Sequence, residues 1–108
     1  MERRELAYIP REKLTRYLLA ETHPVGGPKA QFFRRLGYSE SNVDMLERNL
    51  LEIARTQPIQ DVISSQYGVK FVIEGTLTAP VGTRVSVVTV WIIESEDDNP
   101  RFVTAYPV

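Results

Sequence analysis

The chain has 108 residues, of which 43% are hydrophobic and 25% charged, and its formal net charge is −1. This composition excludes disordered and collagen-like chains, and the net charge argues against a protein that coats nucleic acid. The lack of cysteine excludes disulfides and thiolate metal sites, and no apolar run reaches the roughly 20 residues that cross a bilayer. We therefore expect one cytoplasmic domain over residues 1–108, with no membrane segment.

The first half of the chain, about residues 10–55, has the apolar period of helices. Within residues 10–21, Leu14, Tyr17 and Leu18 recur at i, i+3 and i+4, which places them on one face of a helix. This pattern predicts an amphipathic helix whose inward stripe includes Tyr17.

Two further helices follow in this half. Pro28 suits the first turn of a helix over residues 28–36, and Gly37 suits the position after its end. A third helix is predicted over residues 43–55, where apolar side chains again recur on one face. The helical half therefore contains three predicted helices.

The second half, about residues 67–107, changes its apolar period to two. Residues 67–80 alternate apolar and polar side chains, as a half-buried strand does. Residues 84–94 are apolar on both faces, which predicts a central strand, and residues 101–107 predict a short last strand. The fold class is therefore α+β: three N-terminal helices packed on a three- to four-stranded antiparallel β-sheet.

The loop THPVGGPKAQ, residues 22–31, holds the chain's single histidine. A histidine exchanges protons readily near neutral pH, so His23 is a candidate for proton transfer. Lys29 follows the pair Gly26 and Gly27 at the predicted start of a helix, where amides and a lysine suit a phosphate oxygen. The same residues also suit a plain helix–helix connector with Lys29 in water. Both interpretations stay open from the residues alone.

The last strands supply the other candidates. Thr104 and Tyr106 are two residues apart, so they point to one face of the last strand and can form a hydrogen-bonding platform. Arg101 suits an anion or an ion pair with the acidic turn before it. Thr89 belongs to the central strand, and Trp91 is expected to lie in the core.

Charge is unevenly distributed along the chain. Residues 1–37 carry eight Lys and Arg against four Glu, a balance of +4, whereas the remaining residues balance to −5. A basic face that attracts an anion is possible, although solvated helix faces of mixed charge are the more ordinary interpretation. The sequence lacks glycine-rich phosphate-loop motifs and metal-ligand spacings, so we expect no cofactor and no metal.

Several segments together resemble an uncharacterised bacterial domain family, frequent in cyanobacteria and found alone or at the ends of polymorphic toxins. The segments that carry this resemblance are KLTRYLL, HPVGGPKAQFF, LGY, YGVKF, TVWII and PRFVTAYP. That family in turn is similar to the barnase–EndoU–colicin–RelE group of small ribonuclease folds. The resemblance implies metal-independent RNA cleavage, or descent from an enzyme that performs it.

The resemblance also implies a set of site residues. In the helix loop, His23 and Lys29 match polar positions of the family. On the strands, the matching polar residues are Thr89, Arg101, Thr104 and Tyr106. We expect the catalytic residues to be His23, Lys29, Thr104 and Tyr106. We expect substrate contacts from Arg101, Thr89, Gly26 and Gly27. Since one histidine takes one proton role at a time, Tyr106 or Lys29 would supply the other.

Two hypotheses of different classes follow. The first is a toxin-like domain that cleaves RNA without a metal. The second is a non-catalytic protein-interaction module, or a toxin–antitoxin component, derived from the same fold. The expected partners are accordingly RNA, or a cognate antitoxin or immunity protein. The sequence predicts no oligomeric state.

Overall fold

The computed structural model describes residues 1–24 and 27–108, and its helices precede its strands. The helical elements are the 3-10 turn η1 (Arg4–Leu6), α1 (Arg11–Lys13), the π-helical η2 (Leu14–Leu18), α2 (Gly27–Arg35), the 3-10 turn η3 (Glu40–Asn42) and α3 (Val43–Thr56). The strands are β1 (Ile59–Ser65), β2 (Gly68–Thr78), β3 (Arg84–Glu94) and β4 (Arg101–Pro107).

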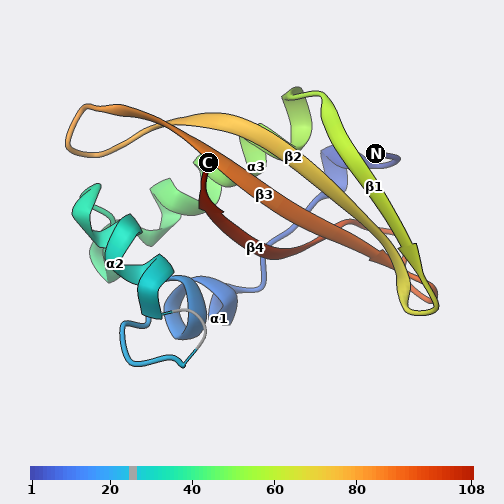
Figure 1. Cartoon of the computed structure of the whole chain (residues 1–108), viewed down its shortest axis with the longest axis horizontal. Helices are drawn as coiled ribbons and strands as arrows, with labels where there is room; N and C mark the ends of the chain where they lie inside the picture. Colours follow the sequence, from blue (N-terminus) through green and yellow to red (C-terminus); the bar gives the residue numbers. More distant parts are fainter. Residues whose placement is uncertain (25–26) are drawn as a thin grey trace.

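The strands form one antiparallel sheet in the order β1-β2-β3-β4 (Figure 1). The predicted α+β class, with helices packed on this sheet, is confirmed. The prediction that residues 84–94 form an inner strand is also confirmed, because β3 pairs with β2 on one side and β4 on the other.

Strand β1 begins at Ile59, before the expected start of the sheet half at residue 67. Ile59 is the only partly buried residue of β1, and the rest of the strand is exposed. An edge strand that buries neither face has no alternating apolar pattern, which is why periodicity did not reveal it.

Helix α3 packs against the middle of the sheet, where it contacts β2 and β3. Leu46, Leu50 and Ile53 of α3 are buried, as the third predicted helix required. It comes close to the sheet at Gly75 of β2, where an added Cβ would stand 2.6 Å from Ile53 Cγ1. Glycine therefore lets α3 lie directly on the sheet.

Helices α1 and α2 and segment η2 lie beside β4, at the other edge of the sheet from β1 (Figure 1). The sequence predicted one regular helix over residues 10–21, and this is wrong in its detail. After α1 the chain widens into a π-helical turn, and Leu19 N donates to Leu14 O over five residues at 2.8 Å. Leu14 and Leu18 are nevertheless fully buried, so the predicted inward stripe is kept.

Candidate functional site

Tyr17 joins the helical half to the last strand. Its Oη lies 2.9 Å from Thr104 Oγ1 on β4 and accepts a 2.9 Å hydrogen bond from Lys29 Nζ on α2. All three side chains are partly buried. Because an ammonium can only donate, Lys29 is the donor in its bond to the phenol, whereas either hydroxyl can donate between Tyr17 and Thr104. Three elements thus meet at one phenol oxygen.

Two lysines stand over the Tyr17 ring. Lys13 Nζ lies 5.0 Å and Lys29 Nζ 5.3 Å from the ring centroid, both within cation–π range. Burial by itself raises the pKa of Tyr17, but hydrogen bonds with Lys29 and Thr104 and the two lysine charges outweigh it and lower that pKa. The phenol of Tyr17 therefore loses its proton more readily than that of an isolated tyrosine.

His23 also contacts the Tyr17 ring. The two ring centroids are 5.1 Å apart and the rings are nearly perpendicular, an edge-to-face contact. The backbone around His23 is also fixed: His23 N donates to Ala20 O, and His23 O accepts from Gly27 N at 2.9 Å. We call Lys13, Tyr17, His23, Lys29 and Thr104 the Tyr17 cluster.

Gly27 allows this loop to close tightly. It is buried at the start of α2, and an added Cβ would stand 2.7 Å from the backbone oxygen of Glu21. A side chain there would clash with that backbone oxygen. Gly27 therefore shapes the loop, whereas Gly26, the other expected glycine, lies outside the described residues.

Backbone irregularities occur in both elements that supply the Tyr17–Thr104 contact. Tyr17 lies in the π-helical η2. On β4 the register shifts because Val90 pairs with Thr104 while Trp91 pairs with Phe102, which leaves Val103 as an extra residue. Lys13 Nζ donates to Val103 O at 3.3 Å. Such π-turns and β-bulges are found preferentially at functional sites, where they redirect side chains.

The remaining predicted strand residues lie in different environments. Tyr106 pairs with Val88 and shares a face of β4 with Thr104, as alternation requires. Arg101, at the start of β4, forms an ion pair with Glu94 of β3. It lies beside the acidic turn, which is the alternative that the sequence left open for it.

The assignment of Thr89 to substrate contact needs correction. Thr89 is fully buried, where its hydroxyl donates to Ile73 O at 2.7 Å and accepts from Trp91 Nε1 at 2.8 Å. No substrate reaches a hydroxyl that is buried and occupied in both directions. Trp91 is itself fully buried and packs against Phe102, as predicted for a core residue.

Sequence reasoning missed Tyr17 and Lys13 as site residues. Tyr17 was assigned to the inward stripe with Leu14 and Leu18 on the basis of spacing alone. A tyrosine buries its ring well and still presents a hydroxyl, so the presence of Tyr within that stripe was the available signal. Nothing in the sequence indicated a role for Lys13, because its contact with Val103 depends on where β4 lies in the fold.

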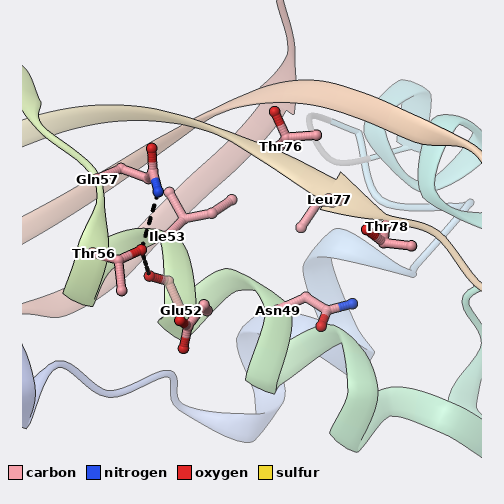
Figure 2. Close-up of a pocket in the computed structure, with 8 residues that line it drawn as sticks. All are labelled: Asn49, Glu52, Ile53, Thr56, Gln57, Thr76, Leu77 and Thr78. Atoms are coloured by element: carbon pink, nitrogen blue, oxygen red, sulfur yellow. Dashed lines mark hydrogen bonds between the residues drawn. The ribbon is translucent and has the colours of Figure 1, made fainter.

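Two pockets lie away from the Tyr17 cluster. A pocket of about 200 Å³ lies between α3 and β2. Figure 2 shows that Thr56 there donates to the Glu52 backbone and accepts from Gln57, so the Thr56 hydroxyl bonds within its own segment. A second pocket, of about 490 Å³, includes Arg34, whose charge is paired with Glu21 and Glu40.

The described residues offer neither a cluster of metal ligands nor a membrane-spanning helix. In residues 1–24 and 27–108, no three His, Cys, Asp or Glu side chains gather as metal ligands would. None of the helices in that part of the chain combines the length and the apolar character that a membrane crossing requires.

Comparison with known proteins adds a family to this geometry. A family model, described as a domain of unknown function, DUF6883, matches residues 1–108. The chain belongs to the DUF6883 family. No functionally curated protein matches the sequence of this DUF6883 domain.

The DUF6883 domain also resembles a solved structure. It superimposes on one chain of a contact-dependent growth inhibition toxin–immunity protein complex from Klebsiella pneumoniae 342, with a TM-score of 0.77. The match covers 99% of this chain and 97% of that chain at 16% sequence identity. At this identity the likeness establishes a shared fold.

Proposed function

We propose that this protein is a toxin-like domain that cleaves RNA without a metal ion, and that the Tyr17 cluster is its active site. The observation that carries the proposal is the phenol of Tyr17, held between Lys29 and Thr104 with its pKa lowered. An acidified phenol next to a histidine and two lysines provides both proton transfer and charge stabilisation for a phosphodiester.

The proposed reaction is an internal transfer at phosphorus. His23 removes the proton of the ribose 2′-hydroxyl, and the 2′-oxygen attacks the adjacent phosphorus. The bond from phosphorus to the 5′-oxygen breaks, and Tyr17 gives its proton to that oxygen. The products are a 2′,3′-cyclic phosphate and a 5′-hydroxyl, so atoms and charge balance without a further reactant.

The lysines and Thr104 stabilise the charges that develop. When Tyr17 loses its proton, the ammonium of Lys29, 2.9 Å from its oxygen, stabilises the phenolate. Lys13 adds a second positive charge above the ring. The Thr104 hydroxyl, 2.9 Å from the Tyr17 oxygen, donates a hydrogen bond to the phenolate that forms. The structural neighbour from a toxin–immunity complex is consistent with a toxin-like role.

Incubation of the purified protein with single-stranded RNA in EDTA tests the proposal. Cleavage to 2′,3′-cyclic phosphate ends is expected, and Tyr17→Phe and His23→Ala are each expected to reduce the rate by about 10²–10⁴-fold. Tyr67→Phe is the matched control, because Tyr67 is 70% exposed in the β1–β2 turn. Intact RNA at high protein concentration, or equal rates for Tyr17→Phe and the native protein, would contradict the proposal.

A binding role for a cognate partner is the second candidate function. The β1–β2 hairpin exposes three large apolar side chains, Val62, Ile63 and Tyr67, at 51%, 49% and 70%. Exposed apolar residues on an edge strand are typical of a surface that another protein covers. Co-purification with the product of the neighbouring gene, lost in Ile63→Lys and kept in Tyr17→Phe, with RNA left intact, would favour this function.

A further inference from the structure

We propose that Tyr106 is a stacking platform for the nucleobase next to the phosphodiester bound at the Tyr17 cluster. This inference rests on the proposed function and assigns the recognition of single-stranded RNA to one aromatic ring. It also replaces the expected catalytic role of Tyr106 by a binding role.

The register of β4 places the ring beside the cluster. Thr104 pairs with Val90 and Tyr106 with Val88, so the two side chains share one face of the sheet. Ala105 between them is fully buried on the opposite face. Two residues along a strand span about 7 Å. Tyr106 is therefore the next side chain after Thr104 on the face that a bound phosphate would approach.

Tyr106 is accessible and its backbone is fixed. The residue is 38% exposed, so part of it can be reached from solvent. The ladder continues past it, because Val87 pairs with Pro107 and Val108 N donates to Ser86 O at 3.2 Å. A ring on an ordered strand loses little conformational freedom when a base stacks on it. Its position thus suits stacking better than a side chain on a loop would.

The surroundings of Tyr106 tolerate a polyanion. Residues 101–108 contain no Asp or Glu, and the cross-strand neighbours Val88 and Val90 are apolar. Glu74 of β2 pairs with Val88 from its other side, which places it two strand spacings, about 10 Å, from β4. A phosphodiester chain that passes from Thr104 to Tyr106 therefore meets hydroxyl, apolar and aromatic groups.

Stacking of a nucleobase on the Tyr106 ring predicts weak selectivity among the four bases. Every nucleobase has a π-face, so stacking on a tyrosine accepts all four bases. Loss of one such contact weakens binding by about 5- to 150-fold, which corresponds to the usual stacking contribution. Phenylalanine keeps the ring, so Tyr106→Phe should bind almost as the native protein does. A proton-transfer role for the hydroxyl predicts the opposite for that variant.

The test uses a probe that the protein is unable to cleave. A single-stranded 2′-O-methyl oligoribonucleotide carrying one 2-aminopurine is titrated with the native protein, Tyr106→Ala and Tyr106→Phe. Tyr67→Ala is the control for loss of an exposed tyrosine, and circular dichroism checks the fold. We expect stacking to quench the 2-aminopurine in the native protein and in Tyr106→Phe, with about 5- to 150-fold weaker binding and no quenching in Tyr106→Ala.

The outcomes separate this inference from the proposed function. Equal affinity and quenching in Tyr106→Ala and the native protein overturn the stacking role, even if cleavable RNA is cut. Loss of cleavage in Tyr106→Phe with unchanged binding also overturns it, because the hydroxyl would then be catalytic. Tyr106-dependent quenching by a protein that leaves unmodified RNA intact supports the platform and contradicts the proposed cleavage. Absence of any binding by the native protein overturns the inference.

Discussion

The ammonium of Lys29 donates a 2.9 Å hydrogen bond to the phenol oxygen of Tyr17, although one residue lies on α2 and the other in the π-helical η2. The bond joins the helical segments that precede and follow the loop with His23. It holds the two helical segments together beside β4.

Replacement of Lys29 by methionine should raise the pKa of Tyr17. Burial raises this pKa, whereas the hydrogen bond and charge of Lys29 lower it, so their loss leaves burial less opposed. Phenolate absorbance, titrated with alkali, should show one tyrosine ionising at a higher pH than in the native protein. The Tyr17→Phe protein identifies which transition belongs to Tyr17. Lys70→Met, at an exposed position of β2, is the control and should leave that transition unchanged.

The pH dependence of RNA cleavage should move in the same direction. As the proposed general acid, Tyr17 must be protonated, so the rate falls on the alkaline side as the phenol ionises. A native pKa below the ordinary value places that fall at a lower pH than an isolated tyrosine would. Lys29→Met should shift the fall to higher pH and reduce the maximal rate. A pH profile identical to the native one would exclude Tyr17 as the acid.

Substitution of Thr89 by valine should destabilise the fold and leave the chemistry intact. The change keeps the side-chain shape but removes the bond to Ile73 O and leaves Trp91 Nε1 buried without an acceptor. A loss of about 1–3 kcal/mol in the free energy of unfolding is expected, measured by urea denaturation. RNA cleavage per folded molecule should be unchanged. Thr78→Val, at an exposed position of β2, should have little effect on stability.

Arg101 should contribute little to cleavage. Its guanidinium is paired with Glu94 beside the acidic turn, and such partly exposed pairs contribute about 0–1 kcal/mol. Arg101→Gln should therefore keep the KM for RNA close to the native value. Glu94→Gln, which leaves Arg101 without this carboxylate, is the matched control. A large rise in KM for Arg101→Gln alone would show that Arg101 does contact the substrate, as the sequence suggested.

The close packing of α3 on β2 can be tested at Gly75. A Cβ there would stand 2.6 Å from Ile53 Cγ1, so Gly75→Ala overpacks the core and should cost about 1–3 kcal/mol. Ile53→Ala alone should also destabilise, because it leaves a cavity. The double variant should be more stable than the sum of the two losses predicts. Strict additivity in the measured unfolding free energies would contradict this contact.

The amino-acid sequence by itself determined the elements that bury a periodic stripe. Helix α3 and strands β2 and β3 followed from side-chain spacing, because each has one face or both faces in the core. Helix α2 followed from Pro28 and Gly37 near its two ends. Strand β1 buries neither face, so its sequence has no alternation of apolar and polar residues that would predict it. Residue chemistry also selected His23, Lys29 and Thr104, which contact Tyr17 in the fold.

Tertiary structure alone decided what those residues touch. Spacing placed Tyr17 and Leu14 on one helix stripe, yet the π-helical turn and the β-bulge at Val103 bring the Tyr17 hydroxyl to Thr104. Thr89 carries the same hydroxyl as Thr104 but lies in the core. Spacing along the chain reports which side chains face inward. The partner of a polar group depends on how distant elements pack, because hydrogen bonds form over about 3 Å whatever the separation in sequence.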